Sequence, residues 1–477
     1  MESSAVLDRS SEAQLEDSPY TGHAPASPAG PVDDTEPLRA PPSVRLPRAL
    51  QTLRFTKRQI QFVFAARREL GEVFEVRFVV IPGGVVLTSH PDHVRSLFTA
   101  KPEVVPSLTA ESPLRPIVGP NSVLTANGSG HLRQRKLLLP PFHGEAIESY
   151  TQMIRDVTER ELDHWPVDRP FALAPKMQAI TLDVIMSGIF GIEGVPARGS
   201  TEHRLRVTIK QLAAASTSPL ALLGELSNLG REKPVGLTRA AVALLDRATY
   251  PVIEERRRAA DLDERGDILS LLLRATSEDG ERMTDHELRD ELLTLVLAGF
   301  ETTANSLAWT WERLVRTPAA YERLRDAVRS DTQSAKHVEA AIIEGMRSRP
   351  VIPIIGRRVA VPWRLGEYVV PAGQGVSISI LLVHHREDLY PDPFTYRPER
   401  WLDHSPGTYE WLPFGGGTRR CLGAALAMAE QRVVLEAMVR RLDLEADRPE
   451  PEHALHRNVT MIPGRGARVV LRSRVAG

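Results

Sequence analysis

Cysteine is almost absent from this sequence: Cys421 is the only one among 477 residues. A single cysteine excludes an internal disulfide, so the fold does not require an oxidising compartment. It also excludes zinc sites built from paired cysteines, iron–sulfur clusters held within one chain, and CxxCH attachment sites. Any chemistry that sulfur performs in this chain must therefore depend on Cys421.

Net charge and long apolar runs are also lacking. The chain carries 60 Lys and Arg against 61 Asp and Glu, and this balance gives no reason to expect nucleic acid as a partner. The densest apolar run, LLTLVLAGF at 292–300, is far shorter than the ~18 residues of a membrane span. The N-terminal segment has no basic stretch followed by an apolar one, as a signal peptide would. We therefore expect a cytoplasmic protein without a membrane span.

The chain divides into two parts by composition. Residues 1–41 are rich in Pro, Ser, Ala, Asp and Glu and show no periodicity, so we expect a disordered N-terminal tail. Residues 42–477 contain no linker and no repeat, and we expect them to form one domain.

Most of this domain has the composition and the three- and four-residue apolar spacing of helices. They are predicted over 143–164, 171–190, 201–229, 236–261, 265–277, 285–316, 318–331, 336–348 and 423–443. Turn residues between β-branched runs predict three hairpins, at 73–89, 365–380 and 459–471. The expected fold class is mainly α: a large multihelical domain with a small β-rich subdomain. Because βαβ alternation is missing, a doubly wound nucleotide-binding sheet is disfavoured.

The only cysteine lies in the segment PFGGGTRRCLG, 413–423. Its glycines do not form a phosphate loop, since no Lys-Ser/Thr follows at Walker spacing and GxGxxG would need a glycine at Arg420. An isolated cysteine is usually a small buried hydrophobe. Here, two flanking arginines and a helix that begins directly afterwards favour a thiolate. A thiolate can be a nucleophile or a metal ligand, and no nearby histidine offers the base that a nucleophile needs.

The pattern Phe414-x-x-Gly417-x-Arg419-x-Cys421-x-Gly423 closely resembles the haem-binding signature of the cytochrome P450 family. This resemblance implies that the Cys421 thiolate is the axial ligand of the iron of haem b. It also implies that Phe414 packs beside the sulfur, that Gly417 and Gly423 permit close approach to the porphyrin, and that Arg419 meets a haem propionate. A thiolate ligand donates electron density to the iron and favours O–O cleavage.

A second motif lies in a helix that is apolar on almost all sides, so it should run through the centre of the molecule. Thr284-Asp-His-Glu287 has the form of a capping box, and the helix would be about 45 Å long. Read alone, Thr302 bonds the Ala298 carbonyl and Gly299 is a packing contact.

Ala298-Gly299-x-Glu301-Thr302-Thr303, however, resembles the oxygen-activation motif of the same family. The resemblance implies a groove for dioxygen at Ala298, beside the haem. It also implies that Glu301 and Thr302 are catalytic, with an acid and a hydroxyl supplying protons in sequence.

Two further groups of charged residues match the family pattern. Glu344-x-x-Arg347 places both side chains on one helix face, where a solvated surface pair is the usual outcome. The segment Tyr396–Trp401 resembles the family's second arginine segment, with Tyr where Phe is more usual. The resemblance implies that Arg400 joins Glu344 and Arg347 in a buried structural network, since buried charges persist only when paired.

The segment HLRQRKLLLPPF at 131–142 places His131 and Arg135 on one helix face. The resemblance implies that both reach haem propionates, and that Arg358 is a further propionate ligand, with Arg357 as the alternative. Planar guanidinium groups suit carboxylates. Four other cations, Arg133, Lys136, Arg420 and Arg432, are expected to form a positive patch for an acidic electron donor, although an exposed basic helix is an equal alternative for the first two.

The family resemblance covers residues 42–477 and implies a monooxygenase that inserts one atom of O2 into a hydrophobic small molecule. Too few residues follow Cys421 for a fused flavin reductase, so electrons are expected from ferredoxin and ferredoxin reductase. The alternatives are a haem-thiolate binding or gas-sensing protein and a peroxide-driven enzyme of the same fold. By family topology the pocket is lined from Val104–Val123, Leu295, Ala298, Thr302, Val351–Ile355 and Met461, which are mostly apolar.

Overall fold

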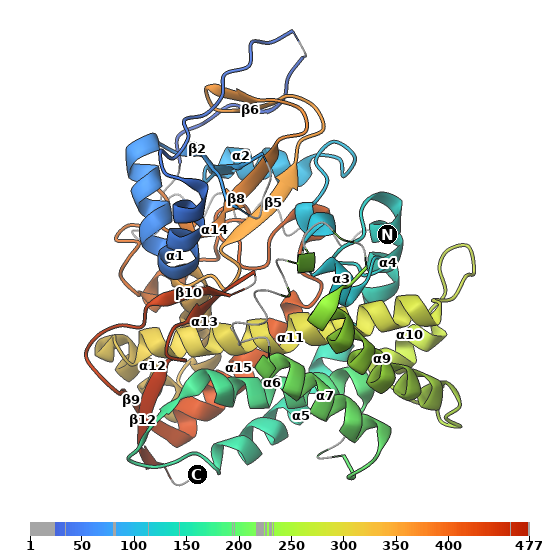
Figure 1. Cartoon of the computed structure of the whole chain (residues 1–477). Helices are drawn as coiled ribbons and strands as arrows, with labels where there is room; N and C mark the ends of the chain where they lie inside the picture. Colours follow the sequence, from blue (N-terminus) through green and yellow to red (C-terminus); the bar gives the residue numbers. More distant parts are fainter. Residues whose placement is uncertain are drawn as a thin grey trace, which may run out of the picture.

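The structure is a computed structural model that describes residues 24–475, except 34, 80–82, 113, 143, 193, 195, 216–223, 225–226, 229–230, 232 and 458. A large helical body lies beside a smaller β-rich region (Figure 1), as expected. The helices are α1 (Arg48–Leu70), α2 (Pro91–Thr99), α3 (Arg115–Val118), α4 (Gly128–Leu138), α5 (Glu145–Leu162), α6 (Leu173–Phe190), α7 (Thr201–Ala215), α9 (Gly236–Arg257), α10 (Ile268–Arg274), α11 (Asp285–Leu314), α12 (Pro318–Arg329), α13 (Ser334–Ser348), α14 (Ile380–Val383) and α15 (Ala424–Arg441).

The predicted helices agree with these bounds to within a few residues at most ends. The prediction over 201–229 is confirmed to residue 215, and much of its remainder lies outside the described residues. Helix α1 was not predicted, because its buried face includes Gln51 and Gln59 and its backbone is non-helical at Arg58, which breaks the apolar spacing. None of the described helices is both long enough and apolar enough to cross a membrane.

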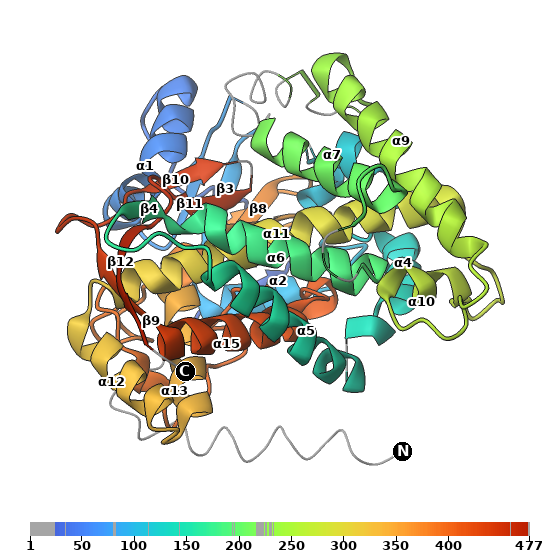
Figure 2. The same cartoon turned by 90° about the horizontal axis from the view of Figure 1, so that it is seen from below.

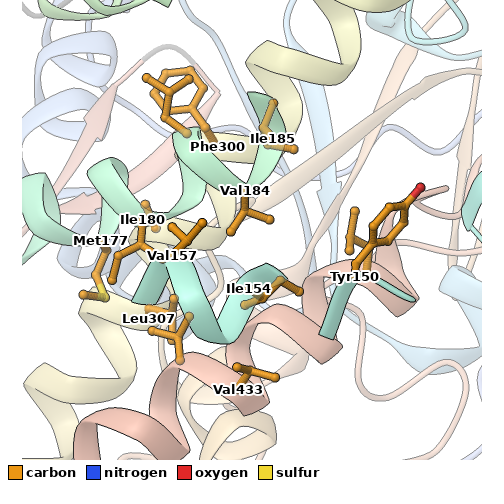
Figure 3. Close-up of a cluster of buried hydrophobic side chains, with 14 of the residues drawn as sticks. Tyr150, Ile154, Val157, Met177, Ile180, Val184, Ile185, Phe300, Leu307 and Val433 are labelled. Carbon is orange, nitrogen blue, oxygen red and sulfur yellow. The ribbon is translucent and has the colours of Figure 1, made fainter. Parts of the chain in front are cut away.

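Helix α11 runs through the middle of the helical body, with α6 packed along it and α5 and α15 beyond (Figure 2). Its N-terminus has the expected capping box: Thr284 Oγ1 accepts the Glu287 N–H, and the Glu287 carboxylate accepts the Thr284 N–H. Side chains of all four helices meet in one cluster (Figure 3), among them Ile154, Ile180, Leu307 and Val433. This cluster fixes α11 as the rigid axis on which the site is built.

Gly299 allows α6 to approach α11 closely. A Cβ at this position would lie 2.4 Å from Cδ1 of Ile185, which points toward α11 in Figure 3. The packing role considered for Gly299 is therefore confirmed, and it explains why a residue of low helix propensity stands in the central helix.

The described strands form four sheets. The largest has the strand order β2 (Val73–Val76), β3 (Val85–Thr88), β8 (Gly375–Ser379), β5 (Ile354–Arg358). Two sheets have three strands each, in the orders β1 (Ala29–Pro31), β6 (Trp363–Leu365), β7 (Tyr368–Val370) and β4 (Pro170–Ala172), β12 (Arg468–Arg474), β9 (Leu442–Ala446). The fourth sheet pairs β10 (Ala454–Arg457) with β11 (Thr460–Pro463).

The hairpin predicted at 73–89 is confirmed, since β2 and β3 pair antiparallel. The other two are wrong. Strand β7 pairs with β6 whereas β8 pairs with β3 and β5, and β11 pairs with β10 whereas β12 pairs with β4 and β9. The strands exist, but their partners are remote in sequence, which a local turn signal cannot reveal.

The folded chain begins before the expected boundary at residue 42. Ala29–Pro31 pair antiparallel with Trp363–Leu365, and the Pro25 carbonyl accepts a hydrogen bond from His90 at 2.7 Å. Residues 1–23 lie outside the described part of the chain. The composition of residues 24–41 suggested disorder because the strand edge that orders them lies more than 300 residues away.

Candidate cofactor site

The segment 413–423, called here the cysteine loop, leads into α15. The Cys421 N–H donates to the Phe414 carbonyl at 2.9 Å, which closes the loop, and the Phe414 ring packs edge-on against Trp411. Protein surrounds Cys421, yet the residue is exposed, as expected for a residue that lines an internal space. Burial raises the pKa of the thiol, whereas the Gly423 N–H and the cations of Arg420 and Arg135 act against that rise.

The glycines of the cysteine loop have different roles. Gly417 has φ +64°, and a Cβ there would lie 2.2 Å from the Phe98 carbonyl oxygen of α2. Its small size is therefore required by the contact with α2, while its role in the approach of a porphyrin stays a prediction. A Cβ on Gly423 would meet nothing within 4 Å, so this glycine borders open space.

The opposite wall of this space comes from α11. Most of the helix is buried, but Leu295, Gly299 and Thr302 are partly accessible and Ala298 is exposed. Their spacing of three and four residues places them on one face. Apart from the Thr302 hydroxyl and the partly exposed Glu301, which is paired with Arg457, the accessible surface of α11 between Leu295 and Thr302 is apolar.

Two connections tie α11 to the cysteine loop and α15 on either side of that face. Toward the N-terminus, Glu291 accepts the Val123 N–H at 2.8 Å, while Arg419 donates to the Val123 carbonyl at 3.3 Å. Toward the C-terminus, Ser306 donates to Gln431 of α15 at 2.7 Å. The exposed Ala298 lies between these two connections along α11.

Four basic side chains gather at this space: His131, Arg135, Arg357 and Arg419. Burial, then the charges of the three arginines, lower the pKa of His131 to about 4, which shows that the four groups lie close together. Burial also lowers the pKa of Arg357 and of Arg419 to about 10, so both remain cations at neutral pH. Within the described residues no carboxylate pairs with any of the four, although buried cations require anionic partners. The group fits the two propionates of a haem.

These cations are held by neutral acceptors. Arg135 donates to the Arg420 carbonyl at 2.8 Å, and Arg357 donates to the Gly356 carbonyl at 3.0 Å with its guanidinium over the Phe98 ring. Arg419 donates to carbonyls of residues 123, 124 and 126 and to the Asn127 side chain. Among the described residues the His131 imidazole has no hydrogen-bond partner. Donor capacity therefore remains for an anionic ligand.

Of the two arginines considered as the further propionate ligand, Arg357 lies beside His131, whereas Arg358 is paired elsewhere. Arg358 is partly exposed and forms an ion pair with Glu111 at 2.6 Å. Because the two arginines are neighbours on β5, their side chains leave on opposite faces. Ile355 shares the face of Arg357 and lies against Gly415 of the cysteine loop, which shows that this face borders the site.

The acid and the hydroxyl of α11 are both engaged. Thr302 Oγ1 donates to the Ala298 carbonyl at 2.5 Å, which is the local bond that the sequence allowed as an alternative. Glu301 forms an ion pair with Arg457 of β10 through Oε1. Arg457 was not predicted, since only the fold brings the hairpin β10–β11 to α11.

The charged network expected behind the cysteine loop is present and completely buried. Glu344 binds Arg347 at 2.8 Å and 2.9 Å and Arg400 at 3.2 Å, and it accepts the Trp401 indole N–H at 2.9 Å. Burial alone would raise the pKa of Glu344, but Arg347, Arg400 and their hydrogen bonds hold it below its usual value. The role of this network is structural.

Sequence reasoning missed His384, which joins the network to the cysteine loop. Its carbonyl accepts a hydrogen bond from Arg347 at 2.6 Å, and its Nε2 accepts the Leu412 N–H at 2.7 Å. Burial and Arg347 lower the pKa of His384 to about 3, so the ring stays neutral and can accept that bond. A histidine directly after the apolar run Ile380–Val383 was the available signal.

The positive patch expected for an electron donor is largely neutralised. Three of its cations form ion pairs, namely Arg133 with Glu287, Lys136 with Glu278 and Arg432 with Glu339. Arg420 is exposed and has no ion pair within the described part of the chain. Met461 also differs from expectation: it is fully buried against Trp309 and does not line the accessible space.

Comparison with known proteins agrees with this geometry. The cytochrome P450 family model matches residues 40–469. Cytochrome P450 138 of Mycobacterium tuberculosis is 37% identical over 450 residues, covering 94% of this chain and 99% of that protein. Cytochrome P450 135B1 of the same organism is 34% identical over 446 residues, covering 93% of each chain. A solved structure of cyanobacterial CYP120A1 with retinoic acid bound has the same fold, with a TM-score of 0.75 at 24% identity, covering 92% of this chain and 100% of that one.

Proposed function

This chain belongs to the cytochrome P450 family of haem-thiolate monooxygenases, and from this premise we propose that Cys421 is the axial ligand of its haem iron and that its substrate is a hydrophobic small molecule. The observation that carries the proposal is the group of four basic side chains, none paired with a carboxylate of the described residues, together with the exposed Cys421. In this assignment Arg419, Arg357, Arg135 and His131 hold the propionates, and Phe414 supports the loop through its carbonyl.

When bound, the haem supplies the iron that activates O2, so that one oxygen atom enters the substrate and the other leaves as water. The residues of this chain govern the protons that the reaction consumes. Thr302 Oγ1 donates to the Ala298 carbonyl, which leaves its oxygen lone pairs free to accept a proton. Arg457 binds Oε1 of Glu301, so Oε2 is the atom that we assign to proton transfer.

The substrate proposal rests on the accessible face of α11. Leu295, Ala298 and Gly299 offer no hydrogen bond, and the Thr302 hydroxyl proton is already donated to the Ala298 carbonyl. An apolar wall of this kind binds apolar ligands best. Screening compounds for a shift in the haem absorption spectrum when they bind beside α11 would define the substrate class.

Ferredoxin and ferredoxin reductase remain the proposed electron donors, in the cytoplasm. Arg420 supports this proposal, because it is exposed one residue before Cys421 and is a cation that an acidic partner can contact.

The carbon monoxide difference spectrum of the reduced protein tests the ligand assignment. The wild type should show the spectrum of thiolate ligation, and Cys421→Ser should lose it even if haem is retained. An unchanged spectrum in the variant would remove Cys421 from the site.

Product analysis separates the proposal from its alternatives. A monooxygenase forms product with NADPH, ferredoxin and reductase, a sensor forms none, and a peroxide-driven enzyme forms product only with added peroxide. Thr302→Ala should keep substrate binding but divert electrons to hydrogen peroxide. If product per NADPH stays the same in this variant, the hydroxyl has no part in proton delivery.

A further inference from the structure

The segment that comprises most of α1 and the residues before it is strongly basic, although the whole chain is nearly neutral. Between Glu36 and Glu69 the sequence contains no Asp or Glu but eight cations: Arg39, Arg45, Arg48, Arg54, Lys57, Arg58, Arg67 and Arg68. Helix α1 holds six of them and lies at the edge of the molecule in both views (Figure 1, Figure 2).

Most of these cations lack a carboxylate partner. Arg39 pairs with Glu367 and Arg67 with Glu72. The other six, defined here as the α1 basic face, are all exposed and form no ion pair within the described residues: Arg45, Arg48, Arg54, Lys57, Arg58 and Arg68. This differs from the cations near the cysteine loop, where Arg133, Lys136 and Arg432 each bind an acid.

Large apolar side chains are exposed at the same place. Leu53, next to Arg54, is 50% exposed, and Val79 is 60% exposed. The Val79 N–H donates to Thr52 Oγ1 at 3.0 Å, so these two apolar side chains lie on adjacent parts of the surface. The opposite side of α1 is anchored in the protein by Phe55, Phe62 and Val63, which fixes the orientation of the exposed side.

We propose that the α1 basic face, together with Leu53 and Val79, binds peripherally to the surface of an anionic lipid bilayer. Unpaired Lys and Arg are attracted to anionic headgroups, and clusters of four to eight basic residues are typical of such binding. The exposed leucine and valine favour a bilayer over a polynucleotide, since phosphate backbones offer them no apolar environment whereas the headgroup region does. The inference does not depend on the haem chemistry.

Vesicle co-sedimentation of the haem-loaded protein tests the proposal. The probes are phosphatidylcholine vesicles with and without about one third phosphatidylglycerol. The wild type should bind the anionic vesicles at low salt, bind the neutral ones at least about tenfold more weakly, and be released at high salt. The double variant Arg54→Glu/Lys57→Glu should lose at least about tenfold in partitioning to anionic vesicles.

A matched control has the same change in net charge elsewhere. Arg155→Glu/Arg282→Glu reverses two exposed cations, one on α5 and one just before α11, and should partition like the wild type. Leu53→Ser should weaken binding without altering its salt dependence. The haem spectrum of each variant reports whether it is folded.

Three outcomes would overturn the proposal: no binding of the wild type to anionic vesicles at low salt, equal binding of the two double variants, or tighter binding of the wild type to random duplex DNA than to the vesicles. The last result would assign the α1 basic face to polynucleotides.

Discussion

Arg457 of β10 forms an ion pair with Glu301 of α11, so the acid of the oxygen-activation motif is held by a residue 156 positions later in the chain. Both side chains are about four-fifths buried, with 20% of each exposed. This pair has consequences for the proposed proton transfer.

Glu301→Gln should lower product formed per NADPH by about a hundredfold, because the acid is lost. Arg457→Gln should lower it by about tenfold, because the carboxylate is no longer held in position. A double variant no worse than Glu301→Gln shows that Arg457 acts through the acid. The control is Arg465→Gln, which breaks a different ion pair: Arg465 follows β11 and binds Asp447. Additive losses would mean that Arg457 has a separate role.

Arg357 and Arg358 form a matched pair for testing the propionate assignment. Arg357→Gln should weaken haem binding by about ten- to a hundredfold, since it removes a charge-assisted hydrogen bond to a buried anion. Arg358→Gln breaks the ion pair with Glu111 and a hydrogen bond to the Gly373 carbonyl, and it should leave haem binding unchanged. Haem transfer to an excess of apomyoglobin measures both variants. If the Arg358→Gln variant lost haem faster than the Arg357→Gln variant, Arg358 would be the propionate ligand.

Glu344→Gln should destabilise the protein by about 3–5 kcal/mol, because it leaves Arg347 and Arg400 buried without a counter-charge. Glu339→Gln, on the same helix, removes an exposed pair with Arg432 and should cost less than about 1 kcal/mol. Urea unfolding followed by circular dichroism compares the two. Similar midpoints would show that the buried network contributes little.

Stability should decrease as the pH falls below 6.5, in part because of His384. Its pKa is about 3 in the folded protein and 6.5 when unfolded, so between these values the unfolded chain binds the extra proton. Where the unfolded chain binds one proton more than the folded protein, the free energy of unfolding changes by about 1.4 kcal/mol per pH unit. His384→Gln keeps an acceptor for the Leu412 N–H and should reduce the slope between pH 5 and 6 by about that amount. An unchanged slope would mean that His384 is charged in the folded protein.

The local parts of the site were predictable from sequence and the long-range parts were not. The spacing of Cys421, Glu301–Thr302 and Glu344–Arg347 is set within single loops or helices, so the residues themselves identify it. The choice between Arg357 and Arg358 depends on which face of β5 meets the cysteine loop, which no local pattern shows. Arg457 and His384 act through residues far away in sequence, and only the packed structure places them.

The same limit explains the errors in the fold. Strand β8 has the expected composition, but it pairs with β3, almost 300 residues earlier. Helix α1 was missed because its packing face contains buried glutamines: Gln51 donates to the Val44 and Leu46 carbonyls and accepts the Arg77 N–H. Polar side chains that satisfy loop backbone look like surface residues in a sequence.

The pairing of Ala29–Pro31 with β6 bears on how this enzyme should be produced. A recombinant version trimmed to start at Pro42 would strip a strand from the sheet and leave β6 with an open edge, which invites intermolecular association. It would also remove the hydrogen bond between the His90 ring and the Pro25 carbonyl. His90 stands at the start of α2, and Phe98 of the same helix lies against the cysteine loop. Shortening the N-terminus to improve yield is thus expected to weaken cofactor retention through α2.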